Sequence, residues 1–183
     1  MTTLSKISTI DNNEEYAWNN VYELEEFQSF NRLKIGCASL EVAAILNFCK
    51  NMNGPFGVLH VLLVSRTGER PGRYESTPFT YEELELFLWE NQEYIEQDGR
   101  HHIWVSSLSN EGQFIYDQHN FIYAYGDTEG YMKILQEKGF TQDSIEITCP
   151  HTHNYHFEFD DHERSLTQQP KWKHHPLQDG DDY

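Results

Sequence analysis

The residues best suited to chemistry are histidines near the end of the chain. His151 and His153 lie two positions apart, and Cys149, His156 and Glu158 are close by. Alternate residues of an extended segment point to the same side, so the two imidazoles could face one ion. Imidazole nitrogens are ligands that zinc and other transition metals prefer. The segment thus offers a candidate metal site made of His151, His153, His156 and Glu158, for an ion such as zinc.

Two histidines do not complete a metal site. A third ligand could be His156 or Glu158, or a residue earlier in the chain such as His101, Asp117 or His119. Two other interpretations are open. In the first, the histidines are polar loop and strand-end residues that form local hydrogen bonds. In the second, they form a pH-sensitive surface. A metal site here would suit a hydrolase in which metal-bound water is the nucleophile.

Other catalytic chemistry has little support. The chain lacks G-x-S-x-G, a phosphate-binding glycine loop, H-E-x-x-H and paired C-x-x-C motifs. Cys37 precedes a predicted helix, but nothing nearby supplies a base, so we expect it to pack in the core. Arg66, Arg70 and Arg73 could hold an anion. The preferred interpretation is that they neutralise the acidic residues that follow them in the chain. The sequence therefore favours a protein without enzymatic activity.

The composition is strongly acidic, with 13 Lys and Arg against 30 Asp and Glu and a formal net charge of −17. The negative electrostatic field that this charge creates repels nucleic acid and anionic membrane surfaces. Eight acidic residues and no basic one lie between Arg73 and Arg100. Charge of this density steers a basic partner toward a protein, which makes a basic protein the expected partner.

Our leading hypothesis is a soluble, cytoplasmic interaction protein of the inhibitor or immunity type, and the alternative is the metal-dependent hydrolase. The chain has no apolar run of about 18 residues that could cross a membrane, and its first residues lack the pattern of a signal peptide. The candidate interface joins acidic residues to tyrosines of an aromatic-rich segment: Glu82, Glu83, Glu85, Glu90, Glu93, Tyr116, Tyr123 and Tyr125.

The order of the expected helices and strands predicts an α+β domain over residues 1–164, followed by a partly ordered acidic tail over 165–183. Helices are expected at 11–29, at 39–52, from a Thr80/Glu83 capping box to Gly99, and from Asp127 to Gly139. Strands are expected at 58–64, 103–107, 113–117, 121–125, 144–149 and 155–159. Together they predict an antiparallel sheet of about five or six strands, a meander plus a hairpin, with about four helices packed on it.

Overall fold

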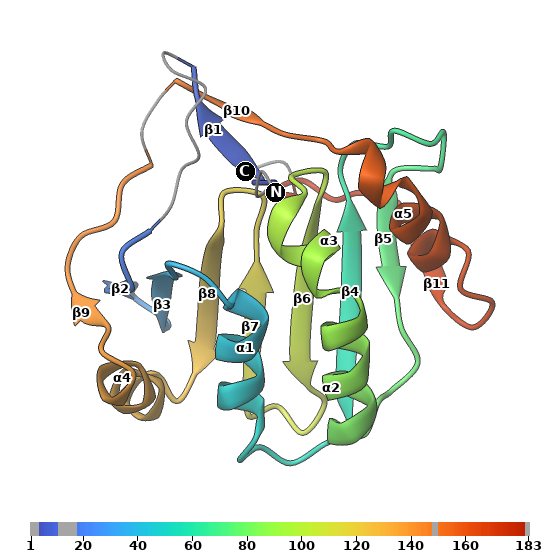
Figure 1. Ribbon diagram of the computed structural model, residues 1–183. Helices are drawn as coiled ribbons and strands as arrows, with labels where there is room; N and C mark the ends of the chain where they lie inside the picture. The colour runs from blue at the N-terminus through green and yellow to red at the C-terminus, as the bar shows by residue number, and fades with distance from the viewer. Residues whose placement is uncertain (1–3, 11–17, 148–149, 182–183) are drawn as a thin grey trace.

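A computed structural model describes residues 4–10, 18–147 and 150–181. Helices cover one face of a large sheet, and a small two-stranded sheet stands beside one end of its strands (Figure 1). Among the described residues the large sheet has nine strands, in the order β11 (Lys173–His175), β5 (Gly72–Glu75), β4 (Phe56–Leu62), β6 (His101–Ser107), β7 (Gly112–Tyr116), β8 (Phe121–Gly126), β3 (Asn31–Gly36), β2 (Val21–Glu26) and β9 (Thr141–Gln142).

All neighbouring strands of this sheet run antiparallel except β2 and β9, which pair in parallel. The α+β class is therefore confirmed, whereas the expected five or six strands are too few. The small sheet pairs β1 (Ile7–Thr9) with β10 (His151–His153), also antiparallel. The helices are α1 (Glu41–Cys49), α2 (Tyr81–Glu90), α3 (Gln92–Gln97), α4 (Thr128–Glu137) and α5 (Asp160–Thr167), with a 3-10 turn at Phe157–Phe159.

The core lies between one face of the sheet and the helices α1, α2 and α4. Alternation along each strand sends Val58, Val105 and Phe114 to this face, where they share a cluster with Ile45 of α1 and Leu88 of α2. The residues between them, including the cross-strand row of Leu59, Trp104, Ile115 and Tyr123, point to the opposite face. In the part of the chain that the structure describes, no helix is long and apolar enough to cross a membrane.

The helix expected at 11–29 is wrong where the structure describes it, because residues 21–26 form β2. Tyr22 and Leu24 pack on the core while Glu23 and Glu25 alternate with them, which is the period of a strand. The acidic surface assigned to a helix belongs to a strand that pairs along its whole length with β3. The rest of the expected helix, residues 11–17, lies outside the described residues.

The hairpin expected from 144–149 and 155–159 is also wrong. Residues 144–147 form no strand, residues 148–149 lie outside the described part, and residues 157–159 are a 3-10 turn that leads into α5. The strand that does form, β10, pairs with β1 at the other end of the chain. Beyond α5, β11 pairs with β5 at the edge of the large sheet, and buried Asp181 accepts hydrogen bonds from Arg73.

Candidate metal centre

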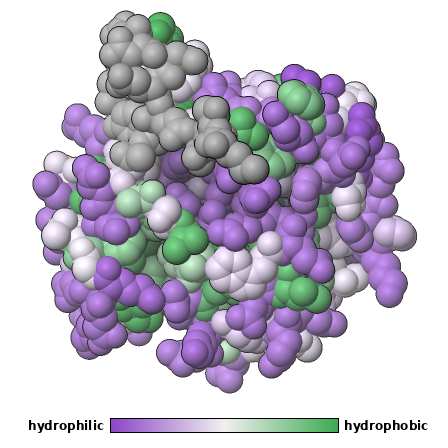
Figure 2. Space-filling view, viewed as in Figure 1, coloured by the Kyte–Doolittle hydropathy of each residue, from purple (hydrophilic) through white to green (hydrophobic). Residues whose placement is uncertain are grey.

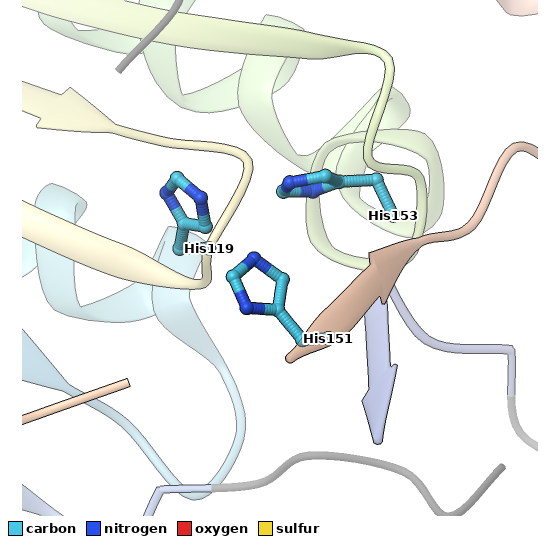
Figure 3. Close-up of side chains that lie close together, drawn as sticks. All are labelled: His119, His151 and His153. Atoms are coloured by element: carbon cyan, nitrogen blue, oxygen red, sulfur yellow. The ribbon is translucent and has the colours of Figure 1, made fainter. Parts of the chain in front are cut away.

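Three histidines from two separate segments turn their rings toward one another (Figure 3). His151 and His153 come from β10, and His119 comes from the loop between β7 and β8. One ligand nitrogen from each lies within 4.8 Å of the others. The ring centroids are 5.3 Å apart for His119 and His151, 4.9 Å for His119 and His153, and 5.1 Å for His151 and His153. The imidazoles thus form a nearly equilateral group.

The pairing of β10 with β1 explains why two of the rings share a side. His153 lies opposite Ile7 and His151 opposite Thr9, so both side chains leave the same face of the two-stranded sheet. Thr152 lies between them in the chain and leaves the other face, where its hydroxyl is 3.1 Å from that of Ser8. The structure thus places His151 and His153 on one face of β10, as alternate residues of an extended segment.

The loop that carries His119 is held by Asp117, the residue that follows β7. One carboxylate oxygen of Asp117 accepts hydrogen bonds from the backbone amides of His119 and Phe121, each at 2.9 Å. Asn120 takes a left-handed conformation with φ 63°, which its short side chain tolerates. These bonds close the turn and point the His119 ring toward β10.

The second oxygen of Asp117 lies 3.1 Å from Nδ1 of His119. Burial raises the pKa of this carboxyl, but its hydrogen bonds to His119 and to the Phe121 amide outweigh burial and leave the pKa below its usual value. The ionised carboxylate can only accept, so a neutral His119 ring in this pair has its proton on Nδ1 and its lone pair on Nε2. Nε2 is then the atom that can bind an ion.

The environment of His153 also favours a neutral ring. Burial, followed by repulsion from His119 and His151, lowers its pKa to about 4. Its Nδ1 atom is buried and has no hydrogen-bond partner among the described residues. This nitrogen is therefore available to an ion, and metal binding requires the neutral form of imidazole.

The geometry fits a tetrahedral ion after a small inward movement of the rings. With zinc–nitrogen bonds of about 2.0–2.1 Å, tetrahedral ligand nitrogens are about 3.3–3.4 Å apart. The separations of up to 4.8 Å here exceed this by an amount that side-chain rotation can remove. Three nitrogens would leave the fourth tetrahedral position to water or a ligand.

Two of the four metal ligands predicted from sequence lie elsewhere. The ring of His156 lies 3.0 Å from the carbonyl oxygen of Ser5, and Glu158 is exposed on the 3-10 turn. Their place is taken by His119, which the sequence offered only as one of several third ligands. The spacing Asp117-x-His119 in a short strand connection is the signal for it, because a carboxylate two residues away can orient the ring.

The predicted docking residues do not form one surface. Glu82, Glu83, Glu85, Glu90 and Glu93 are exposed on the helix layer. Tyr123 and Tyr125 alternate with Ile122 and Ala124, which pack on the helices, so the tyrosines lie on the opposite face of the sheet. Tyr116 is fully buried and donates its hydroxyl to Asn120 at 2.8 Å. The acidic and aromatic parts are separated by the thickness of the domain.

The remaining candidate groups are engaged in structure. Arg66 pairs with Asp160 at 3.1 Å and Arg73 with Asp181 at 2.6 Å, so two of the three arginines already have carboxylate partners. Cys37 is buried, and burial raises the pKa of its thiol well above the ordinary value. Neither arrangement favours an anion site or a reactive thiolate.

Comparison of the chain with protein-family models, with curated proteins and with solved structures finds no match. The histidine group and the charged surface are therefore the features of the molecule that bear on function.

Proposed function

We propose that this protein binds a divalent transition-metal ion, zinc before others, through His119, His151 and His153. The observation that carries the proposal is the convergence of three imidazoles from the β7–β8 loop and from β10. Segments more than 30 residues apart in the chain bring their ligand nitrogens within 4.8 Å of one another. The carboxylate of Asp117 behind His119 supports it, because metal-binding histidines usually donate their second nitrogen to such a group.

The ligand type selects the ion. Imidazole nitrogen suits zinc, copper, nickel and iron, whereas magnesium and calcium take oxygen ligands. Within the described residues this group contains no carboxylate oxygen, which disfavours the two hard cations. Zinc binds three nitrogens and a fourth ligand in tetrahedral geometry, and it undergoes no redox chemistry.

A metal-dependent hydrolase is the second candidate, because the residues that the structure describes supply three ligands to this group, which favours an open site over a closed structural one. Structural zinc sites are usually filled by four protein ligands, whereas catalytic ones keep a position for water. Zinc lowers the pKa of that water to about 7, which makes hydroxide available as a nucleophile at neutral pH. Hydrolysis of 4-nitrophenyl acetate by zinc-loaded protein, compared with protein stripped by chelator, tests this candidate separately from binding.

Elemental analysis tests the binding proposal. Protein made without a polyhistidine tag and dialysed against metal-free buffer should retain about one zinc per chain. The His151→Ala/His153→Ala variant should lose it. The matched control is His174→Ala/His175→Ala in β11, which removes two histidines whose side chains are not part of the group. The proposal would be overturned if the parent protein held no zinc after reloading, or if the His151→Ala/His153→Ala variant retained it.

A further inference from the structure

Helix α2 carries two large apolar side chains on its outer side. Leu84 and Leu88 face the core and are fully buried, whereas Leu86 is 58% exposed and Trp89 is 42% exposed. Leu86 and Trp89 are three residues apart and therefore neighbours on the helix surface. Figure 2 looks onto the helix layer and shows hydrophobic side chains in the open, surrounded by hydrophilic ones.

Glutamates frame this apolar pair along the helix. Leu86 has Glu82 four residues before it and Glu90 four residues after it, and Trp89 stands in the same relation to Glu85 and Glu93. Residues four apart on one helix lie on the same side, so Leu86 is bracketed by carboxylates and Trp89 has Glu85 beside it, whereas Glu93 lies beyond Asn91 in the first turn of α3 (Gln92–Gln97). The four glutamates are exposed, and within the described residues none of them forms an ion pair.

The charge pattern is unfavourable for the helix itself. Glu90 occupies the last position of α2, whose last turn has no basic residue. A negative charge at this end opposes the helix dipole, at a cost of about 0.3–1 kcal/mol. Glu82 and Glu85, three residues apart, also repel each other. A cationic partner would relieve both of these unfavourable electrostatic interactions, whereas Glu82 in the first turn already suits the helix dipole.

We propose that the outer side of α2 docks a basic amphipathic segment of a partner protein. Apolar side chains of that segment pack on Leu86 and Trp89, and its lysines or arginines pair with Glu82, Glu85, Glu90 and Glu93. Charge complementarity identifies the occupant, because an apolar pair inside an acidic frame would repel an acidic segment and leave a neutral one without ionic partners. Trp89 is the expected anchor, since tryptophan dominates binding energy at interfaces and also attracts arginine over its ring.

This surface differs from the interface predicted from sequence. It keeps four of the predicted acidic residues, Glu82, Glu85, Glu90 and Glu93, and replaces the distant tyrosines by Trp89 of α2. It is also separate from the histidine group, so the proposed metal site and the proposed docking surface can fail independently.

A synthetic helical peptide of lysine and leucine in amphipathic order is a suitable probe. A fluorescent label on the peptide reports binding to the full chain by anisotropy at low and at physiological salt. Two control peptides replace every lysine by glutamate, or every leucine by serine. We expect the lysine–leucine peptide to bind at low salt, and each control peptide to bind at least tenfold more weakly.

Variants of the chain locate the contact. Leu86→Ser/Trp89→Ser should weaken binding about thirtyfold, the effect of losing one interface hot spot. Glu85→Gln/Glu90→Gln should weaken it several-fold and reduce its salt dependence. The matched charge control, Glu26→Gln/Glu137→Gln, removes two exposed carboxylates from other elements and should change affinity less than twofold. Circular dichroism confirms folding of each variant.

Two results would overturn the proposal. One is a failure of the lysine–leucine peptide to bind the parent chain at low salt. The other is an equal loss of affinity in the α2 variants and in the Glu26/Glu137 control, because binding would then depend on net charge alone.

Discussion

Asp117 and His119 form a carboxylate–imidazole pair in which Oδ2 lies 3.1 Å from Nδ1. Asp117 is buried, and its other oxygen is committed to two backbone amides of the same loop. The pair therefore fixes which nitrogen of His119 is free and the direction in which it points. This relationship makes His119 one of the three ligands of the proposed metal site.

Replacing Asp117 tests that orientation. Asp117→Asn keeps an oxygen acceptor but removes the charge that holds the proton on Nδ1, and we expect zinc affinity to fall about 10–100-fold. Competition with a chromophoric chelator measures the affinity. His119→Ala, which deletes the ligand, should cost more than Asp117→Asn. Equal affinities for parent and Asp117→Asn would show that the carboxylate serves only the turn.

His101 offers a test of the buried polar groups of the core. Its ring is fully buried and stacks on Tyr94 at a centroid distance of 4.1 Å, but neither nitrogen has a hydrogen-bond partner among the described residues. His101→Phe keeps the stacking and removes both unsatisfied atoms. Urea denaturation should show a free energy of unfolding higher by about 1–3 kcal/mol. A lower value would mean that bound water satisfies the ring in solution.

The dependence of stability on pH should reveal His60. This residue is fully buried, and burial lowers its pKa to about 3, whereas the unfolded chain titrates near 6.5. The unfolded state binds the proton first, so stability is complete above pH 6.5 and declines as the pH falls toward 3. The slope from this one group reaches about 1.4 kcal/mol per pH unit.

Unfolding in urea at pH 7, 6 and 5 measures this slope, and His60→Phe should make it shallower. The variant also loses the contact between Nε2 of His60 and the hydroxyl of Tyr94, at 3.1 Å, so its stability at pH 7 is the reference for its own series. A slope that is the same with and without His60 would contradict its assignment as a buried neutral group.

Arg100 is the centre of a buried ionic network. Its guanidinium lies 2.7 Å from Asp98 and 2.5 Å from Glu163, and the side chains of all three are fully buried. Arg100→Met would leave two carboxylates without their cation, at an expected cost of about 3–5 kcal/mol in unfolding free energy. Thermal and urea denaturation measure the cost. Arg164→Met is the control, because Arg164 pairs with exposed Asp161 and should change stability by less than about 0.5 kcal/mol.

Local signals predicted the central part of the fold well. The alternation of apolar residues places β6, β7 and β8 within a residue or two of the expected strands. The capping box of α2 is present as predicted, with Glu83 and Thr80 each accepting a hydrogen bond from the backbone of the other. Both signals act over a few residues and are visible in one segment alone.

Apart from β2, whose own alternation is that of a strand, the errors occur where structure depends on distant partners. Ile7 pairs with His153 across almost the whole chain, and nothing in either short segment identifies the other. The same pairing separates His151 and His153 from His156, because the chain leaves β10 at Asn154 and turns toward Asp98. The third ligand, His119, could be named only as one of several candidates until the strands were placed.

The atoms that surround a bound ion decide whether His119, His151 and His153 form the proposed metal site. X-ray absorption at the zinc edge of protein loaded with one equivalent of zinc measures the first coordination shell. We predict three imidazole nitrogens at about 2.0–2.1 Å and one further ligand, the oxygen of a water molecule. In His151→Ala/His153→Ala protein this signal should be lost. A shell with sulfur ligands, or with oxygen ligands and no imidazole, would contradict zinc binding through His119, His151 and His153.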